Sequence, residues 1–574
     1  MRLSATALRT TTALALSLIL TGCERSAPDA ASPPAREPSA QTAGSDYYGT
    51  LEPFAAEAVY FVVTDRFVNG DPGNDQRDQG GAHPSFDIPL PACDGVVGNI
   101  GYLGGDFRGL LDQADYIREM GFSAVWITPI PDNPDQAFTG GDPITCTSFL
   151  TDRGKAGYHG YWGVNFHRED EHLISEGLGF AELTAGLRGK GLKTVLDIVG
   201  NHGSPAWSMP LRQPGFGQVF AADGRLLADH ENLHPSALAP STHPLHAFYN
   251  PKPDLAQLGD FDTSNPAVVD YLVSAYLRWI DLGADAFRID TIRHAPHDFW
   301  KQVADRVRAE HPGFFMFGEA FAYEAEAIAA HTLPENGGVS VLDFPLKQAL
   351  DEVFAQGVGF ERLAPALYLD GGPYRNVYEL TTFYDNHDMP RMNARDEGFI
   401  DAHNWLFTAR GIPVIYYGSE MGFMRGRAEH AGNRNYFGSE SIAAARAHPI
   451  RQHLTRIAQV RAESIALQKG LQVTLELAGE RAAFYRVFQH GDRHQIALVL
   501  LNKGDSATRF EIRDALQPGE WRSAFDGERI SVSDGGVLAV EVPHHGVRVF
   551  LLDAPVNHPD LVQRLARLMA ATHG

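Results

Sequence analysis

The 574-residue sequence is poor in cysteine and in positive charge, and its N-terminal apolar run is short. Only three cysteines occur, so at most one disulfide can form within the chain. Lys and Arg number 48 against 71 Asp and Glu, and the formal net charge of −23 argues against nucleic acid or an anionic membrane as a partner. We find no internal repeat and no phosphate-binding loop. What remains is the composition of an ordinary globular protein, 44% hydrophobic and 21% charged, long enough for two or more domains.

The N-terminus has the pattern of an export signal. Arg2 and Arg9 precede an apolar run at 13–20 that is too short to span a bilayer, which predicts a signal peptide over residues 1–22. The run ends in Leu-Thr-Gly-Cys, which resembles a bacterial lipobox and implies that Cys23 is lipidated and begins the mature chain. A plain signal peptide with a chance cysteine is the alternative. We therefore expect an exported protein, lipid-anchored on the periplasmic side of a bacterial membrane or at the cell surface.

The region that follows predicts a tether. Residues 23–50 are rich in Ala, Ser and Pro and too polar to form a core. Because an exported protein meets oxidising conditions, a disulfide between Cys93 and Cys146 fits this compartment, although the sequence leaves the pairing open.

From residue 51 to residue 465, strand patterns alternate with helical patterns. Continuous apolar runs such as 59–63 predict strands buried on both faces, and 266–282 has the spacing of a long amphipathic helix. Strands are expected at 58–64, 123–129, 193–198, 284–290, 314–318, 339–344, 379–384 and 413–417. Eight such β-then-α units predict an α/β fold, a (β/α)8 TIM barrel, with a doubly wound open sheet as the alternative.

Two regions depart from this alternation. Residues 203–262 carry scattered Pro, Gly and His and are too long for a simple loop, which predicts a small domain inserted after the third strand. Residues 466–555 contain short strand patterns separated by Gly, Asp and Pro, which predict a C-terminal β-sandwich. In the tail at 556–574, Leu561, Leu565 and Leu568 have the spacing of a short docked helix.

The strand expected at 284–290 ends in a carboxylate, Asp290. Arg288 lies two residues earlier, so both side chains point from the same face of the strand and lie within pairing distance. An arginine there favours the ionised carboxylate that a nucleophile requires. On this stretch alone, a structural Arg–Asp pair explains the pattern equally well.

Polar residues follow three further strands: 197–202 with His202, 318–319 with Glu319, and 385–388 with His387 and Asp388. In a barrel these strand ends meet at one face, where active sites are built. Three acids crowded together repel one another, so a purely structural role is a poor explanation for Asp290, Glu319 and Asp388.

These four strand ends resemble the alpha-amylase family of retaining glycoside hydrolases, in the expected order and at barrel spacing. Further agreement is found at 64–67, 104–109, 158–162, 258–262 and 411–418, and the resemblance covers roughly residues 58–552, with an N-terminal part similar to cyclodextrin glycosyltransferases. It implies that Asp290 is the nucleophile, Glu319 the general acid and base, and Asp388 a stabiliser of the distorted sugar ring. Apolar residues before Glu319 raise a carboxyl pKa, as a general acid needs. Substrate-binding side chains are implied at His159, Tyr161, His202, Arg288, Arg293, His294 and His387.

The resemblance implies an alpha-amylase-type hydrolase that cleaves α-1,4-glucosidic bonds in starch or maltodextrins, acting as a monomer. A glucanotransferase, cyclodextrin-forming or disproportionating, and a cyclodextrin or maltodextrin hydrolase are the nearest alternatives. An α-glucosidase and a non-catalytic glucan-binding lipoprotein are more remote. The chain departs from the family pattern at Arg293, where glucan-acting members often have Lys, and at Ala320, where cyclodextrin-forming relatives often have an aromatic residue. Ala320 and the absence of a further starch-binding module favour hydrolysis.

Calcium is the implied cofactor. The loop at 69–75 gathers oxygen-bearing side chains around glycines, as a hard cation needs. It resembles the N-terminal calcium loop of cyclodextrin glycosyltransferases, which implies ligands at Asn69, Asp71, Asn74, Asp75, Gly104 and Asp106. A second calcium site is implied at Asn201, Asp260 and the backbone of His294, although the sequence around Asp260 differs from the family pattern.

Overall fold

The computed structural model describes residues 45–76, 83–148 and 150–573. The predicted signal peptide, Cys23 and most of the predicted tether lie outside them. Among the described residues, none of the helices is both long and apolar enough to cross a membrane.

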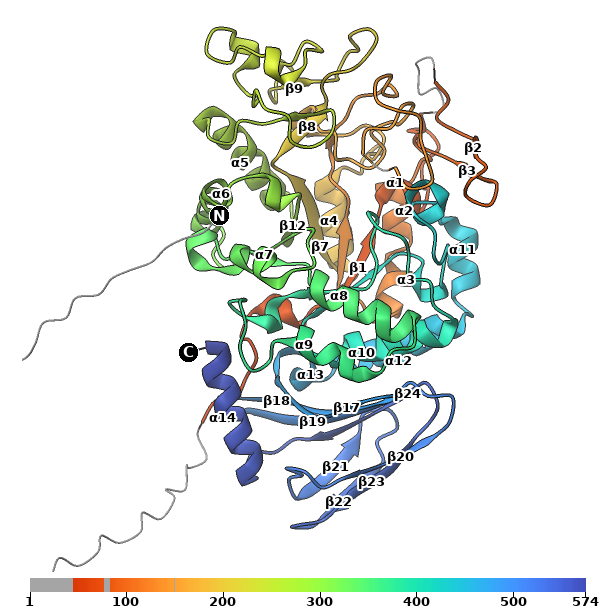
Figure 1. The fold of residues 1–574 in the computed structure, drawn as a ribbon, viewed down its shortest axis with the longest axis vertical. Helices are drawn as coiled ribbons and strands as arrows, with labels where there is room; N and C mark the ends of the chain where they lie inside the picture. The colour runs from red at the N-terminus through yellow and green to blue at the C-terminus, as the bar shows by residue number, and fades with distance from the viewer. Residues whose placement is uncertain (1–44, 77–82, 149, 574) are drawn as a thin grey trace, which may run out of the picture. The chain divides into compact units, whose positions relative to one another are not determined.

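Eight parallel strands form the central sheet, in the order β14-β13-β12-β7-β4-β1-β16-β15. Figure 1 labels three of them, β1, β7 and β12, in the middle of the barrel region. A parallel bridge between Leu342 and Thr381 joins β14 to β15 and brings the two edges together. The predicted (β/α)8 barrel is therefore confirmed. Its strands are β1 (Val59–Val62), β4 (Ala124–Ile127), β7 (Lys193–Val199), β12 (Ala286–Asp290), β13 (Phe315–Gly318), β14 (Ser340–Val341), β15 (Thr381–Thr382) and β16 (Ile412–Tyr416).

The barrel strands are apolar on both faces because helices cover the outside and side chains fill the inside. Within it, Phe61 stacks on Trp126 at 3.8 Å between ring centroids, and Phe317 meets Trp126 edge-on at 5.6 Å. β14 and β15 are shorter than expected at 339–344 and 379–384, since the chain turns into a helix at Phe344 and into a loop after Thr382.

The outer helices begin and end at recognisable caps. The side chain of Asn265 caps α5 and Pro266 occupies its first turn, while Val269, Leu272 and Val273 face the barrel. Two short helices, at 107–112 and 114–119, are separated by Gln113. The helices of the barrel region are α1 (Thr64–Phe67), α2 (Phe107–Asp112), α3 (Ala114–Glu119), α4 (Phe180–Gly189), α5 (Pro266–Asp281), α6 (His297–Glu310), α7 (Ala325–Ala329), α8 (Phe344–Leu350), α9 (Ala364–Leu367), α10 (Asp396–Thr408), α11 (Gly438–Ala445), α12 (Pro449–Ala462) and α13 (Ile465–Lys469).

Three excursions leave the barrel between its strands and helices. The first carries the hairpin of β2 (Ile88–Leu90) and β3 (Val96–Gly98), and the second carries β5 (Pro131–Asp132) and β6 (Asn165–Glu169). The third, after β7, is the region predicted as an inserted domain, with β8 (His202–Pro205), β9 (Gln218–Phe220), β10 (Leu226–Asp229) and β11 (Leu258–Asp260). A disulfide between Cys93 and Cys146 joins the first excursion to the second. The sequence did not reveal the second excursion as a separate unit.

The C-terminal region is the expected antiparallel β domain. Its two sheets have the orders β17-β18-β19-β24-β21-β22 and β20-β23. Arg486 of β18 donates to the backbone carbonyls of Thr408 and Ala409 at the end of α10, which ties this domain to the barrel. Its elements are β17 (Leu471–Ala478), β18 (Arg481–His490), β19 (Arg493–Asn502), β20 (Thr508–Ile512), β21 (Gly519–Ser523), β22 (Arg529–Val532), β23 (Leu538–Val542), β24 (Gly546–Leu552) and α14 (Pro559–His573), in which Leu561, Leu565 and Leu568 are buried.

Candidate active site

The three candidate acids meet at the C-terminal end of the barrel. Asp290 ends β12, Glu319 directly follows β13, and Asp388 lies in the loop after β15. All three line one cavity of about 290 Å³. Thr291, directly after Asp290, adopts φ +47°, so the strand turns sharply where it presents this carboxylate. The same cavity is lined by five of the residues implied as substrate-binding, His159, Tyr161, His202, His294 and His387.

Arg288 holds three carboxylates at once. Its Nη1 lies 2.9 Å from Asp197 Oδ2 and 2.9 Å from Asp290 Oδ1, and its Nη2 lies 2.9 Å from Glu319 Oε2. The side chain is fully buried beneath the cavity and does not line it. Arg288 and Asp197 are directly paired across β12 and β7, so the register of two parallel strands creates this contact. The residue therefore fixes the positions of Asp290 and Glu319 relative to each other.

Burial raises the pKa of Glu319 well above its usual range, and Asp388 and Asp290 add to this effect while Arg288 opposes it. This direction favours the protonated form, which a general acid needs. Burial also raises the pKa of Asp290, with Arg288 opposing the rise. Arg288 therefore favours the charged form of Asp290, as the sequence predicted. Burial of Asp290 acts against Arg288 and raises the pKa.

Asp388 is held in the opposite protonation state. Burial would raise its pKa, but His387, Arg434 and Arg288 outweigh burial and lower it to about 2. Arg434 Nη2 lies 2.7 Å from Asp388 Oδ1, and His387 Nε2 lies 3.3 Å from Asp388 Oδ2. Two neighbouring acids with such different pKa values are typical of a site that uses one as an acid and another as a fixed negative charge.

Burial favours the neutral form of two histidine rings in the cavity, His202 and His387. Burial lowers the pKa of His202 to about 3 and that of His387 well below its usual range. The Nδ1 atoms of both are buried and have no hydrogen-bond partner among the described residues. Tyr161 stacks on His387 at 5.3 Å and donates its hydroxyl to Asp197 at 2.8 Å. A ligand with hydroxyl groups can satisfy the free ring nitrogens.

One residue implied as substrate-binding lies elsewhere. Arg293 does not line the cavity; it is exposed, and its Nη1 donates to the backbone carbonyl of Phe321. Phe321 itself lines the cavity two residues after Glu319 and is 42% exposed. Arg293 therefore acts on the cavity only through the loop that it holds.

Sequence reasoning also missed the residues behind Asp388. Arg434 Nη1 lies 3.1 Å from Glu429 Oε1, and Lys155 Nζ lies 2.8 Å from the same oxygen. Arg434 follows a short turn of helix at Glu429–Asn433 in the loop after β16, whereas Lys155 lies in the excursion after β4.

The residues implied as the first calcium site form a compact loop. The side-chain oxygens of Asn69 and Asn74 are buried and have no hydrogen-bond partner among the described residues. Asn69 donates its amide to Asp75 Oδ1 at 2.6 Å, and a Cβ at Gly104 would lie 2.4 Å from both groups. Only glycine fits at Gly104, where φ is also +89°.

Two other members of this set contact the backbone. The carboxylate of Asp106 caps α2 by accepting from Gly109 N at 2.6 Å, and it also accepts from Asp71 N at 2.7 Å. Asp71 Oδ1 accepts from Gly73 N at 2.9 Å. Asp106 therefore joins the loop to α2 whatever else it binds.

The residues implied as the second calcium site are also close together. Asn201 donates to Asp260 Oδ1 at 3.2 Å, and burial, with Asp254 adding to it, raises the pKa of Asp260 to about 7. His294 Nδ1 lies 2.8 Å from Asp254 Oδ2. Asp254, which the sequence did not single out, therefore belongs to this group.

A separate cluster in the inserted domain contains Glu231, His243 and His246. His246 Nε2 lies 3.2 Å from Glu231 Oε2, and His246 Nδ1 accepts from the backbone N–H of Ala239 at 3.1 Å. With Nδ1 accepting this bond, Nε2 is the ring nitrogen that faces Glu231. The three side chains also offer ligand atoms within 4.8 Å of one another, so this cluster is a candidate metal site.

The alpha-amylase catalytic-domain family model matches residues 61–214 and 241–458. A cyclomaltodextrin glucanotransferase from Geobacillus stearothermophilus is 29% identical over 532 residues, which cover 88% of this chain and 68% of that protein. Another from Klebsiella oxytoca is 27% identical over 554 residues, covering 86% of this chain and 78% of that protein.

Among solved structures, CldA, described as a cyclomaltodextrin glucanotransferase with a three-domain ABC distribution, aligns with a TM-score of 0.70 and 28% identity, over 87% of this chain and 99% of that one. An Anoxybacillus alpha-amylase aligns with a TM-score of 0.65 and 23% identity, over 88% of this chain and 99% of that one, which shows a shared fold.

Proposed function

Because this chain belongs to the alpha-amylase family, we propose that it cleaves α-1,4-glucosidic bonds in starch or maltodextrins with retention of configuration. The observation that carries this proposal is the contact of one buried guanidinium, that of Arg288, with both Asp290 and Glu319. The two carboxyls required for double displacement are thereby held side by side, with the third acid, Asp388, in the same cavity.

In the first step, the carboxylate of Asp290 attacks the anomeric carbon of the bound sugar. The glycosidic C–O bond breaks as Glu319 gives its proton to the leaving oxygen, and a covalent glycosyl ester forms on Asp290. The raised pKa of Glu319 supports this assignment because the residue starts the cycle protonated.

In the second step, Glu319, now ionised, takes a proton from water as the water oxygen attacks the same carbon. The ester bond breaks, Asp290 leaves as a carboxylate, and the two inversions give a product of unchanged anomeric form. Asp388, ionised throughout because its pKa is about 2, would bind sugar hydroxyls and stabilise the positive charge that develops on the ring.

A glucanotransferase is the second candidate, and two observations favour it. The two sequence relatives named above are cyclomaltodextrin glucanotransferases, and CldA, described as a three-domain protein of that kind, aligns over 87% of this chain and 99% of its own length. In addition, the exposed ring of Phe321 beside Glu319 offers an apolar face on which an acceptor sugar can stack in place of water.

A time course on maltoheptaose separates the two activities. Products resolved by size and anomeric form that are short, α-anomeric and never longer than the substrate support a hydrolase. Longer or cyclic products support a transferase. The absence of any product with α-1,4-glucans would contradict both.

Calcium binding is part of the proposal, and the loop at 69–75 fits the ion. The buried amide oxygens of Asn69 and Asn74 have no hydrogen-bond partner among the residues that the structure describes. Together with the carboxylates of Asp71 and Asp75, they are the hard donors that calcium prefers. Gly104 leaves the space open and would supply backbone oxygen, and Asp106 would complete the set. Bound there, the ion would stabilise the loop rather than take part in the reaction.

The group around Asp260 fits a second ion. A cation next to Asn201 and the backbone of His294 would relieve the cost of burying the Asp260 carboxylate beside Asp254. Such an ion would join the inserted domain to the strand end that carries Asp290.

We also propose that the chain is exported and anchored through a lipidated Cys23, and that it acts as a monomer. The Cys93–Cys146 disulfide supports an oxidising compartment. Cys23→Ser should move the protein from the membrane fraction to the soluble fraction; an unchanged distribution would contradict the anchor. Light scattering of the purified protein tests the monomer.

A further inference from the structure

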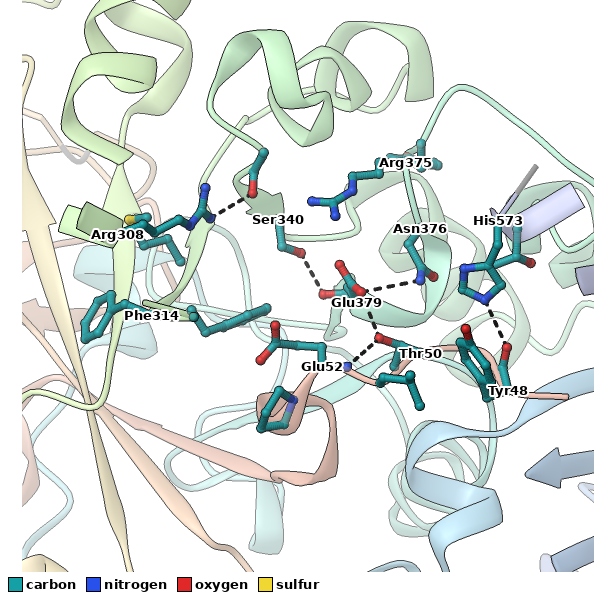
Figure 2. Close-up of a pocket in the computed structure, with 18 of the residues that line it drawn as sticks. Tyr48, Thr50, Glu52, Arg308, Phe314, Ser340, Arg375, Asn376, Glu379 and His573 are labelled. Atoms are coloured by element: carbon teal, nitrogen blue, oxygen red, sulfur yellow. Dashed lines mark hydrogen bonds between the residues drawn. The ribbon is translucent and has the colours of Figure 1, made fainter. Parts of the chain in front are cut away.

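Figure 2 shows a second large cavity, of about 960 Å³. Its lining includes residues at the starts of barrel strands, so it lies at the opposite end of the barrel from the candidate active site. It is lined by Phe315 and Met316 at the start of β13, by Ser340 at the start of β14, and by Glu379, which precedes β15. Glu319 follows the other end of β13, so the barrel separates the two cavities.

Part of the wall comes from segments outside the region that matches the family model. These are residues 48–53, before β1, and residues 571–573, at the end of α14. The ring of Tyr48 and that of His573 lie 4.8 Å apart, and His573 Nε2 bonds to the backbone oxygen of Tyr48 at 3.1 Å. The segment before β1 and the end of α14 thus form one rim of this cavity, which we call the groove.

Two arginines occupy one side of this groove. Figure 2 shows Arg308 and Arg375 extending toward the same space, above Glu52 and Glu379 in that view. Arg308 is held by the backbone carbonyls of Gly337 and Gly338. Burial lowers the pKa of Arg308, and the nearby Arg375 adds to this effect.

Two glutamates occupy the other side. Glu379 Oε1 accepts from Thr50 Oγ1 at 2.7 Å, and Glu52 Oε1 accepts from the backbone N–H of Phe54 at 3.0 Å. Burial raises the pKa of Glu52, with a smaller contribution from Glu379. Within the part of the chain that the structure describes, no ion pair within 4.0 Å joins either arginine to either glutamate.

These charges define the chemistry of a ligand. The two glutamates would repel an anion, and the two arginines would repel a cation, so neither kind of ion suits the whole groove. A sugar hydroxyl donates to a carboxylate and accepts from a guanidinium with the same oxygen. Phe314 and the 43%-exposed side chain of Leu51 add apolar surface for the C–H face of a sugar ring.

We propose that this groove binds a second stretch of the α-glucan chain, away from the site of cleavage. The choice of α-glucan rests on the proposed function, whereas the preference for a neutral polyhydroxylated ligand rests on the groove. Held at both sites, a long glucan would dissociate more slowly than a short one, because the second contact is intramolecular.

Calorimetric titration with maltoheptaose tests the proposal in the Asp290→Asn chain, which does not consume the ligand. Two classes of sites are expected. Adding Arg375→Ala should weaken only one class, by about tenfold, the value of one hydrogen bond to a charged group. Adding Glu52→Gln, which keeps size and shape, should weaken the same class. Arg567→Ala, an exposed arginine of α14 paired with Asp370 outside the groove, is the matched control and should change neither class.

In the otherwise unaltered enzyme, Arg375→Ala and Glu52→Gln should each leave kcat/KM on maltotriose unchanged and raise KM on amylopectin. One class of sites, unaffected by both groove substitutions, would overturn the proposal. One class that both substitutions weaken would support the groove and contradict glucan binding at the candidate active site. The loss of both classes in a variant with altered circular dichroism would indicate misfolding. In that case the isosteric Glu52→Gln variant alone decides whether the groove binds the glucan.

Discussion

Arg288→Lys is the substitution that tests the reasoning about the active site most directly. In the structure, Nη1 contacts Asp197 and Asp290 and Nη2 contacts Glu319, each at 2.9 Å. A lysine keeps the positive charge but has a single nitrogen on a flexible stem, so it cannot hold all three carboxylates in these positions. Removing one partner of a buried ion pair lowers the free energy of unfolding by about 3–5 kcal/mol. Because lysine retains the charge, we expect a smaller decrease of about 1.5–3 kcal/mol, the value of one hydrogen bond to a charged group.

The effect on catalysis should be larger than the effect on folding. We expect kcat/KM to fall about a hundredfold, because a displacement of about 1 Å between reacting groups costs that much. Burial already raises the pKa of Asp290 and Arg288 opposes it, so a weaker partner raises that pKa further. Since the nucleophile must be ionised, the acidic limb of the kcat/KM profile should move to higher pH.

The measurements are a pH–rate profile on maltoheptaose and thermal unfolding of the same samples. Arg278→Lys, the same change at an exposed position of α5, is the control and should alter neither. A folded Arg288→Lys enzyme with kcat/KM within about twofold of the original and an unmoved acidic limb would refute the role given to Arg288.

Three further outcomes are expected. Asp290→Asn should abolish turnover and leave thermal unfolding and glucan binding largely intact; near-normal activity would remove it as the nucleophile. Chelation should lower Tm, because calcium at one hundred times its Kd stabilises the fold by about 2.7 kcal/mol. Asn74→Ala should reduce that shift in Tm, and equal melting curves with and without metal would contradict the calcium sites. The hydrogen bond to Asp401 raises the pKa of His545 to about 9 and thereby outweighs burial, so the charge on His545 stabilises the fold fully below its unfolded pKa of about 6.5, and this contribution is lost as pH rises through 9. Because burial raises the pKa of Asp401 to about 6, His545→Gln should lower Tm at pH 7 and much less at pH 10, and an equal loss at both would contradict the charged pair.

The barrel could be predicted because its signals are local. Runs such as 59–63 are apolar on both faces, which is what a parallel strand between helices and a filled interior requires. The order of eight such units then left few topologies. The excursion that carries β5 and β6 lacks this periodicity, and it is held in place by contacts between distant residues, among them the bond from Cys146 to Cys93. No local pattern reveals a unit of that kind.

The acids could be predicted for the same reason, since each lies at or after the end of a strand whose place in the barrel was known. Arg288 was found from its spacing to Asp290, but its contacts with Asp197 and Glu319 depend on the register of β12 with its neighbours. The assignment of Arg293 depended on its position in the family pattern alone. Its side chain contacts the backbone carbonyl of Phe321 rather than the cavity, because the turn after Asp290 directs it outward.

The protonation states of the site come from residues that the sequence could not bring together. Lys155 and Glu429 are 274 positions apart and meet at 2.8 Å, and Glu429 in turn contacts Arg434, which lies 2.7 Å from Asp388. Arg434 is one of the groups that lower the pKa of Asp388 to about 2, while burial raises that of Glu319. The strand ends therefore account for which acids meet in the cavity, and the long-range contacts account for which of them carries the proton. Spacing along the chain reports the first, whereas for the second the sequence indicates only the apolar residues that precede Glu319.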